Sequence, residues 1–522
     1  MRPLVHEIDT GHSPESLVER LRGEPGVILL RSASSEASQS RYSLVATRPF
    51  LIFRSFGSRC ETEFGAEPGM DRGAELLPQP DPGRERKSRQ AGTVRAPIQV
   101  QFGNPWQVLD GLMSRYELLD EIDLPFPLGG CFGYWGYDLK NFVEPTLPRR
   151  AVNDLELPDC QVGFYDSLAV FDARLGKTWI VSTGLETDGS RSESRAQARL
   201  GFWRAVLNCD PGRHELSTPV PALTGPARSS ITSTLSRAEF MERVERAQRY
   251  IRAGDIYQVN LSQRLAAPCG VSGWDFFKDL SAVSPAPFSA FLDCGGFQIA
   301  SSSPELFLRL SGAHIQTRPI KGTRPRSSDP IRDAQLTYEL QTSAKEMSEL
   351  VMITDLLRND LGKVCEFGSV QVPELVRLER YPQVQHLVST VEGRLRPDST
   401  HFSAFASCFP GGSVTGAPKF RAMEIIDELE PVSRGPYTGA LGYLGFNRES
   451  QLSIVIRSAI CKDGHAHFNV GAGIVADSNP EAEYEETIAK ARGFFSALNL
   501  PAATGFAGRH PDSSPDGIHF FL

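Results

Sequence analysis

Short apolar and β-branched runs, separated by glycine and proline, recur through both halves of this chain and restrict its fold more than any other feature. Runs of this kind, bounded by turn residues, are typical of β-strands. They occur at Val27–Leu30, Leu168–Phe171, Thr178–Ser182, Phe297–Ala300, Leu452–Ile456 and His467–Val470. The second half adds two long stretches with helical spacing, Ser343–Leu357 and Pro480–Arg492. The residues alone therefore predict antiparallel sheet with a few helices, followed by mixed strands and helices, without an internal repeat.

Two polar stretches interrupt this pattern and suggest how the chain is divided. Arg54–Pro97 is rich in Gly, Pro, Arg and Glu, and so polar a segment buries too little surface to order itself, so we expect a flexible insertion there. Residues 210–233 contain four prolines and precede Ser236 and Glu239, which have the spacing of a helix capping box. We predict an N-terminal region, a second region and a tail at residues 1–225, 230–500 and 501–522.

The composition of the 522 residues is that of an ordinary globular protein, with 40% hydrophobic and 23% charged residues. A formal net charge of −8 argues against general binding to nucleic acid or to an anionic membrane, because both favour a basic surface. The nine cysteines are scattered without a Cys-x-x-Cys pair, which fits a reducing compartment. No apolar run reaches the roughly 18 residues needed to span a bilayer, and residues 1–10 lack a signal-peptide pattern. We expect a cytoplasmic protein.

The two helical stretches each carry a pair of carboxylates. Glu346 and Glu349 are three residues apart, as are Glu483 and Glu486, so each pair lies on one face of its helix. Either pair alone is typical of a solvated surface. Pro480 stands at a helix start just after a glycine-rich turn. This context favours the alternative interpretation, in which the two pairs share a site for a hard cation. Mg²⁺ suits such a site, because it binds carboxylate oxygens and keeps several waters.

Two glycine-rich segments suggest nucleotide binding, and both lack the required context. Gly411–Lys419 has the glycine spacing of a phosphate loop but has Ala417 and Pro418 where Lys and Ser or Thr are needed. Gly471–Ala476 matches a dinucleotide fingerprint only formally, because it does not open a helix at its last positions. Glycine amides in either loop could still approach another anion, such as a carboxylate.

These motifs together resemble the chorismate-binding enzymes, which include the large subunits of anthranilate synthase and aminodeoxychorismate synthase as well as isochorismate and salicylate synthases. The resemblance extends from about Ile251 to Phe494 and more loosely over the first half. The segments that carry it are Gly254–Leu261, Ser302–Glu305, Pro319–Thr323, Asp355–Leu361, Phe409–Ser413 and Gly471–Ile474, with Arg41–Ser43, Asn104–Trp106 and Gly129–Tyr134 in the first half. It implies an α+β fold, in which two orthogonally packed antiparallel sheets lie between helical layers and both halves of the chain form one body.

Two positions discriminate between the activities of that family. Its water-using members resemble one another in having a lysine where this chain has Gln258, so ammonia is the expected nucleophile here. Anthranilate synthases typically have alanine at the position of Lys321, whereas aminodeoxychorismate synthases have lysine. The chain therefore resembles aminodeoxychorismate synthase component I, a transferase of the transaminase class that aminates chorismate in 4-aminobenzoate and folate biosynthesis.

The resemblance also implies catalytic roles. Lys321 would attack the chorismate ring at C2, and ammonia would then displace it by attack at C4. Glu305 matches the general acid, which needs a pKa raised by burial. The attacking amine must be neutral, and we expect Arg318, Arg324 and Arg326, which are close in sequence, to favour that form.

The remaining site residues follow from the same resemblance. Glu349 and Glu486 match direct Mg²⁺ ligands, and Glu346 and Glu483 match ligands that act through water. Residues that match contacts to the substrate are Arg457 and Tyr437 at the enolpyruvyl carboxylate, with Gly471, Ser413 and Gln258 as further polar contacts. His386 either lies near the ring or is a structural histidine whose hydrogen bonds are satisfied.

The sequence also has implications for partners. No Cys sits in a nucleophile-elbow context and no lyase domain is evident, so we expect ammonia from a separate glutamine amidotransferase subunit and pyruvate release by an aminodeoxychorismate lyase. Leu29-Leu30-Arg31-Ser32 departs from the Leu-Leu-Glu-Ser segment of tryptophan-binding relatives, which puts tryptophan binding in doubt. Two alternatives stay open: anthranilate synthase component I, or a non-catalytic regulator that binds chorismate or tryptophan.

Overall fold

Two large antiparallel sheets form the centre of the computed structural model, which describes residues 2–32, 41–65, 98–119, 123–209, 231–381 and 383–500. The first sheet has 12 strands. Its order is β1 (Leu4–Ile8), β10 (Lys177–Ser182), β9 (Ser167–Asp172), β3 (Tyr42–Ala46), β2 (Ile28–Arg31), β13 (Phe288–Asp293), β14 (Gln298–Ser303), β23 (Ser458–Lys462), β24 (His465–Ile474), β12 (Gln258–Pro268) and β11 (Thr232–Ser233), with β20 (Gly416–Ala417) also paired to β12. It therefore combines strands from both halves of the chain.

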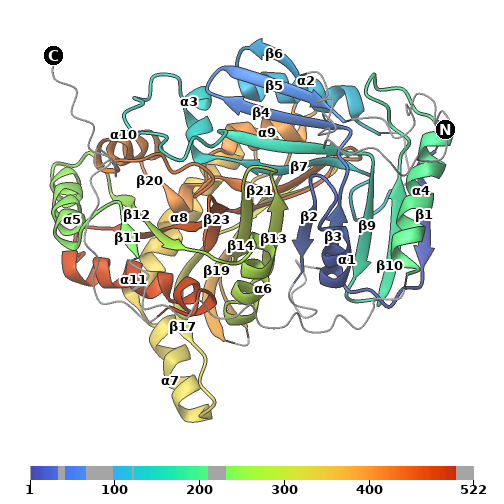
Figure 1. Cartoon of the computed structure of the whole chain (residues 1–522). Helices are drawn as coiled ribbons and strands as arrows, with labels where there is room; N and C mark the ends of the chain where they lie inside the picture. The colour runs from blue at the N-terminus through green and yellow to red at the C-terminus, as the bar shows by residue number, and fades with distance from the viewer. Residues whose placement is uncertain are drawn as a thin grey trace, which may run out of the picture.

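The second sheet is also 12-stranded and is likewise built from both halves. Its order is β17 (Ile320–Pro325), β19 (Val384–Arg394), β16 (His314–Arg318), β15 (Leu306–Ser311), β22 (Glu449–Ile454), β21 (Ala440–Gly445), β7 (Gly130–Trp135), β8 (Cys160–Tyr165), β4 (Leu51–Phe56), β5 (Arg59–Phe64) and β6 (Ile98–Phe102), with β18 (Gln371–Arg380) also paired to β19. In Figure 1, β9 and β10 of the first sheet run upright while β7 of the second lies across them. The two sheets thus cross at a steep angle.

Helices cover the outer faces of both sheets. One group packs on the first sheet: α1 (Pro14–Leu21), α4 (Glu193–Leu207), α5 (Arg237–Arg252), α6 (Gly273–Val283), α10 (Lys419–Leu429) and α11 (Pro480–Ala497). The other packs on the second sheet: α2 (Pro105–Tyr116), α8 (Ala344–Gly362) and α9 (His401–Cys408). The shorter helical segments are α3 (Lys140–Val143), η1 (Tyr137–Leu139) and η2 (Gly412–Val414), and α7 (Pro330–Gln341) extends from the body (Figure 1). The expected α+β fold is confirmed.

Alternation along the strands explains why the first sheet is apolar on both faces. In β13, Ala290 and Leu292 belong to the core between the sheets, whereas Phe291 belongs to the core under the helices. Successive side chains of a strand point to opposite faces, so one continuous apolar run supplies two cores. None of the described helices is both long and apolar enough to cross a membrane.

The predicted insertion at Arg54–Pro97 is wrong in its first part. Arg54 belongs to β4, and β5 follows it through Phe64 with Cys60 and Thr62 buried. Alternation of buried and polar residues, rather than overall polarity, decides that these residues pair. Residues 66–97 lie outside the described residues, as do 210–230 and the predicted tail 501–522.

The predicted start of the second region is confirmed at the level of the helix. Ser236 is the N-cap of α5, and its side chain and that of Glu239 form the expected capping box. The two regions of sequence are nevertheless not separate in space, because each sheet joins a block of strands from one region to a block from the other.

Candidate functional site

Lys321 lies where the two sheets approach each other. It is on β17 of the second sheet, and Gly473 lies on β24 of the first. A Cβ atom placed on Gly473 would be 3.9 Å from Lys321 Nζ and 2.7 Å from Gln258 Nε2 at the start of β12. The lysine, the glutamine and the glycine therefore share one space, and glycine keeps that space open.

Gln258 is buried without using its amide. It is 1% exposed, and neither its Nε2 nor its Oε1 has a hydrogen-bond partner among the described residues. Because an unsatisfied buried amide costs free energy, such a group is typical of a site that a ligand completes. The structure thus brings the predicted substrate contact Gln258 to Lys321.

Glu305 is a buried acid in the same cluster. Burial raises its pKa to about 7, against the opposing effects of a hydrogen bond from Ser413, the charge of Lys321 and the Ile320 backbone N–H. Ser413 is held in η2, which packs against α8 and β20. A carboxyl group with such a pKa is partly protonated near neutral pH and can donate a proton.

The four predicted metal-binding carboxylates come from two helices, as expected. Glu346 and Glu349 lie in α8, and Glu483 and Glu486 lie in α11. Burial raises the pKa of Glu349, and the charges of Glu346 and Glu486 raise it further. The pKa of Glu483 is likewise raised, first by burial and also by Glu486. The two pairs therefore interact across the gap between their helices.

Lysines neutralise this acidic cluster. Lys321 Nζ lies 3.8 Å from Glu349 Oε2, and Lys490 Nζ lies 2.7 Å from Glu486 Oε1. Burial raises the pKa of Glu486, but Lys490, Lys345 and Lys321 outweigh it, so the net shift is downward. Lys345 and Lys490 were not among the predicted site residues, although Lys490 follows Glu486 by four residues, a spacing that places both on one helix face.

The four carboxylates are ligands of the type that magnesium prefers. All four side chains offer carboxylate oxygens, which Mg²⁺ prefers, and their mutual repulsion and burial favour a cation between them. Within the described ranges, no three His, Cys, Asp or Glu side chains converge closely enough to hold a metal in their present rotamers. Side-chain rotation of the glutamates away from their lysines is therefore needed for coordination.

Arg457 is a partly buried cation without an acid partner among the described residues. Burial lowers its pKa, and within the described parts of the chain its guanidinium has neither a hydrogen bond nor an ion pair. Its backbone lies in the left-handed region at φ 53°, between β22 and β23. Strained backbone and an unpaired, partly buried charge are both characteristic of ligand sites. The arrangement is suited to an anion with two oxygens.

His386 lies beside Arg457. Burial and the charge of Arg457 lower its pKa to about 4, so the imidazole is neutral near pH 7. Its Nδ1 is 2.8 Å from Thr323 Oγ1, and Thr323 is opposite His386 in the pairing of β17 with β19. The histidine therefore has a structural partner and also lies within the cluster, so both readings of it stay open.

A second glycine, Gly471, makes room for Tyr437 at the site. A Cβ on Gly471 would be 2.9 Å from the Tyr437 hydroxyl, so only glycine leaves room for this contact. Burial raises the pKa of Tyr437 to about 12, and a hydrogen bond with Asn260 of β12 opposes that rise. The Gly471 carbonyl accepts a hydrogen bond of 2.8 Å from Lys490 Nζ.

A buried ion pair fixes the loop that carries Tyr437. Arg434 donates to both oxygens of Glu430 at 2.6 and 2.8 Å, and to the carbonyls of Asn260 and Val414 at 2.7 and 3.1 Å. These contacts join the Tyr437 loop to β12 and η2. A hydrogen-bonded buried pair of this kind sets the position of its neighbours more than it adds net stability.

The three arginines near Lys321 do not surround it. Arg318 pairs with Glu379, Arg324 with Glu346 and Arg326 with Asp333. Each guanidinium has a carboxylate partner of its own, and that these arginines favour the neutral amine stays a prediction. Lys321 itself pairs with Glu349.

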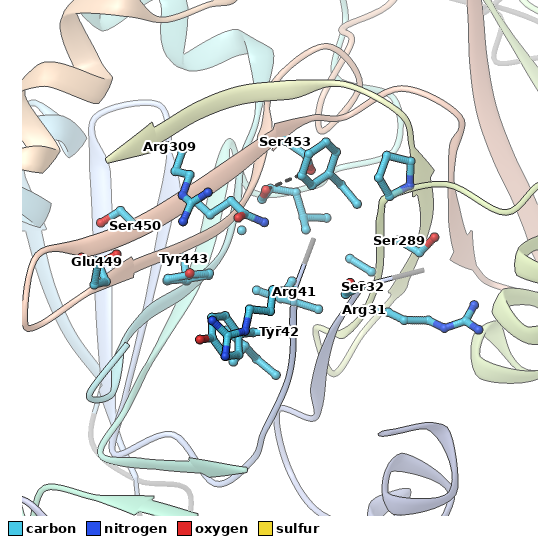
Figure 2. A pocket seen from close by; sticks show the side chains of 18 of the residues that line it. Arg31, Ser32, Arg41, Tyr42, Ser289, Arg309, Tyr443, Glu449, Ser450 and Ser453 are labelled. Atoms are coloured by element: carbon cyan, nitrogen blue, oxygen red, sulfur yellow. Dashed lines mark hydrogen bonds between the residues drawn. The ribbon is translucent and has the colours of Figure 1, made fainter. Parts of the chain in front are cut away.

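A separate cavity of about 200 Å³ lies between the sheets near the N-terminal strands (Figure 2). Leu30, Arg31 and Ser32 line it, so the segment compared with the pocket of tryptophan-binding relatives does border a cavity. Arg31 is directed away from Arg309 and Glu449 in Figure 2 and pairs with Glu15 at 2.5 Å. None of the predicted catalytic, substrate or metal residues lines this cavity.

Comparison with protein families matches residues 75–496 to the chorismate binding enzymes. The chain is 36% identical over 501 residues to anthranilate synthase component 1 of Acetivibrio thermocellus, covering 93% of this chain and 92% of that protein. It is 44% identical over 394 residues to aminodeoxychorismate synthase component 1 of Salmonella typhimurium, covering 75% of this chain and 82% of that protein.

The fold comparison agrees with the sequence comparison. The crystal structure of anthranilate synthase component I from Streptococcus pneumoniae TIGR4 superimposes with a TM-score of 0.69 at 28% identity, covering 88% of this chain and 93% of that one. Family match, relatives and fold together show that this chain belongs to the chorismate-binding enzymes, in the family of anthranilate synthase and aminodeoxychorismate synthase.

Proposed function

We propose that this chain is the large subunit of an aminodeoxychorismate synthase, which converts chorismate and ammonia to 4-amino-4-deoxychorismate. The observation that carries the proposal is the shared space of Lys321, Glu305 and Gln258. A primary amine, a buried acid with a pKa of about 7 and a neutral amide meet there, and no second lysine takes the place of Gln258. An amine nucleophile and a proton donor are what replacement of a ring hydroxyl requires.

The first step joins Lys321 to the ring. Its neutral amine attacks C2, the ring double bonds shift, and the C4–O bond breaks. Glu305 gives its proton to the departing hydroxyl, which leaves as water. In the structure the Lys321 amine pairs with the Glu349 carboxylate at 3.8 Å, so attack on the ring requires that another cation take the place of Lys321 beside Glu349.

The second step releases Lys321. Ammonia attacks C4, the double bonds shift back, and the C2–N bond breaks so that the amine of Lys321 leaves with its electron pair. The Glu305 carboxylate then accepts a proton from the new ammonium group at C4. Two successive displacements restore both side chains and retain the configuration at C4.

Two positive regions would hold the two carboxylates of the substrate. Arg457 and Tyr437 would bind the enolpyruvyl carboxylate, since a planar guanidinium without an acid partner can bind both of its oxygens. Glu349 and Glu486, with Glu346 and Glu483 through water, would hold Mg²⁺, which supplies the charge that neutralises them and binds the ring carboxylate. Gly471, Ser413, His386 and Gln258 would complete the contacts.

The proposed reaction neither produces ammonia nor releases pyruvate, so both steps are assigned to other proteins. We propose that ammonia comes from a separate glutamine amidotransferase subunit and that an aminodeoxychorismate lyase releases pyruvate to give 4-aminobenzoate for folate, all in the cytoplasm. The rival function is that of anthranilate synthase component I, the name that several relatives carry. Lys321 argues against it.

Product identity separates the candidates. The purified chain is incubated with chorismate, Mg²⁺ and an ammonium salt at mildly alkaline pH, and the product is identified by mass and absorbance. Aminodeoxychorismate, which keeps the enolpyruvyl group, is the expected product. Anthranilate, which is aromatic and has lost pyruvate, would refute the proposal, as would isochorismate or binding of chorismate without turnover.

A further inference from the structure

Two cysteines meet at the end of the first sheet opposite the Lys321 cluster. Cys269 directly follows β12, and Cys461 lies in β23. The strand between them is β24, in which Ala466 is opposite both Cys461 and Ala267. Strands β12 and β24 reach the Lys321 cluster with their other ends, at Gln258 and Gly473.

The two thiols are neighbours at the wall of one cavity. The backbone N–H of Cys269 donates to the Gly464 carbonyl at 2.7 Å, which brings the chain after β12 against the turn between β23 and β24. Each thiol is close enough to the other to shift its pKa. On its other side, Cys461 Cβ would lie 3.2 Å from a Cβ on Gly273, so the first residue of α6 must be small to admit it.

A cavity of about 230 Å³ gives access to the pair. Both cysteines line it, together with Gly295, Gly296 and Gly464. A Cβ on any of these three glycines would have no atom within 4 Å, so this wall is open. The cavity can therefore admit one end of a small molecule as far as the sulfur atoms.

The pair differs from the other described cysteines. Burial raises the pKa of six of them: Cys60, Cys131, Cys160, Cys294, Cys365 and Cys408. For Cys269 the neighbouring Cys461 thiol lowers the pKa to about 7, while the pKa of Cys461 is raised by the same contact and by burial. Cys269 is thus the sulfur that more readily becomes a thiolate, which is the form that attacks disulfides.

We propose that Cys269 and Cys461 form a thiol–disulfide exchange site for low-molecular-weight disulfides. The Cys269 thiolate attacks one sulfur of a disulfide RSSR, forming Cys269–S–S–R and releasing one RS⁻. Cys461 then loses its proton to solvent and attacks the Cys269 sulfur, forming the Cys269–Cys461 disulfide and releasing a second RS⁻. Two protein thiols are oxidised and one RSSR is reduced to two thiols.

Such a bond would be reversible in a reducing compartment, where protein disulfides are usually transient. It would join the end of β12 to β23 across β24. The proposal is independent of the reaction assigned to the Lys321 cluster.

The test treats the native chain with 2-hydroxyethyl disulfide, quenches it by alkylation and maps the peptides by mass. We expect a peptide containing Cys269 linked to one containing Cys461, formed at least about tenfold faster than any adduct on Cys209, because reaction follows thiolate character and access. Cys461→Ser should stop at the mixed disulfide on Cys269, and Cys269→Ser should leave Cys461 unmodified. Cys209→Ser, which changes a half-buried cysteine just after α4, beside β10 near the other edge of the first sheet, is the matched control and should behave as wild type.

A second measurement does not depend on disulfide geometry. Phenylarsine oxide, which bridges neighbouring thiols, should bind in equal molar amount to wild type and to Cys209→Ser, and should not bind to Cys269→Ser. Circular dichroism of each variant shows whether it is folded. A Cys269 adduct that persists in wild type without transfer to Cys461, or arsenical binding that survives Cys269→Ser, overturns the proposal.

Discussion

At the scale of single residues, burial determines what the ionisable groups of the site can do. Glu305 is enclosed in protein, and its pKa is raised to about 7. Arg457 is partly buried, with no acid beside it among the described residues. The same low polarity therefore produces a proton donor in one place and a strong anion site in the other.

Glu305 makes the reaction depend on pH with a definite sign. A general acid donates only while protonated, so kcat/KM at constant free ammonia should fall as pH rises through about 7. Glu305→Gln keeps the shape but has no proton to give, and we expect it to lower kcat by about 10²- to 10⁴-fold and to remove this pH dependence. The pH–rate profiles of both proteins measure the effect.

The control for this prediction is Glu374→Gln, which changes an exposed carboxylate on β18. It should leave rate and profile unchanged. If Glu305→Gln retains the wild-type profile, another group supplies the proton.

Arg457 should determine affinity more than turnover. Arg457→Ala removes a charged bidentate partner, which is worth roughly 1.5–3 kcal/mol, so we expect KM for chorismate to rise by about 10- to 100-fold with a smaller change in kcat. Arg457→Lys keeps the charge but loses the planar fork, and should restore only part of the affinity. Arg377→Ala, at an exposed arginine of β18, is the control. An unchanged KM in Arg457→Ala would place the carboxylate elsewhere.

At the scale of elements, β24 shows why a strand can need glycine. Gly471 leaves room for the Tyr437 hydroxyl, and Gly473 leaves room for the side chains of Gln258 and Lys321. The strand remains paired with β12 over its full length. The face of β24 that carries these two glycines thus forms one wall of the site, and the absence of side chains there leaves the space open.

Gly473→Ala should reduce activity without unfolding the protein. The new Cβ would be 2.7 Å from Gln258 Nε2, so the amide must move toward the substrate space. A displacement of about 1 Å in a reacting site can cost roughly 100-fold, and we expect kcat/KM to fall by about 10- to 100-fold with little change in the urea midpoint. Gly296→Ala, whose Cβ meets nothing within 4 Å, should change neither quantity. Full activity in Gly473→Ala would mean that Gln258 does not touch the substrate.

Elements with a strong local pattern could be predicted from the sequence. Strands such as β9 and helices such as α8 and α11 lie where apolar runs and helical spacing place them, and the α5 cap is formed by Ser236 and Glu239. Strand β5 was missed because its polar residues outnumber the apolar ones, although they alternate. Lys490 was missed because a lysine on an acidic helix is normally a surface residue.

At the scale of the whole molecule, local sequence patterns do not determine the order of the strands in each sheet. Strand β2 of the first half pairs with β13 of the second, and β7 pairs with β21 in the same way. Such pairings depend on contacts between residues hundreds of positions apart, whose geometry no short window of sequence records. The resemblance to a known family, rather than the residue pattern, predicted that both halves form one body.

The site is assembled from both sheets, each of which joins strands from the two halves of the chain. Lys321 arrives from the second sheet, Gln258 and Gly473 from the first, and the carboxylates from helices on opposite sides. Sequence could therefore name these residues only through the family resemblance. It could not show that lysines neutralise the carboxylates or that Arg318, Arg324 and Arg326 are engaged elsewhere.

The central claim is that Lys321 carries chorismate during amination, and the most direct measurement compares wild type with Lys321→Ala. Both are incubated with chorismate and Mg²⁺, with either ammonium or glutamine as nitrogen source, and Lys177→Ala, at an exposed lysine of β10, is the control. We expect wild type and Lys177→Ala to form aminodeoxychorismate from ammonium but not from glutamine. Intact protein mass after quenching without ammonia should show the chorismate ring attached to Lys321. Aminodeoxychorismate formed by Lys321→Ala at the wild-type rate would contradict the account.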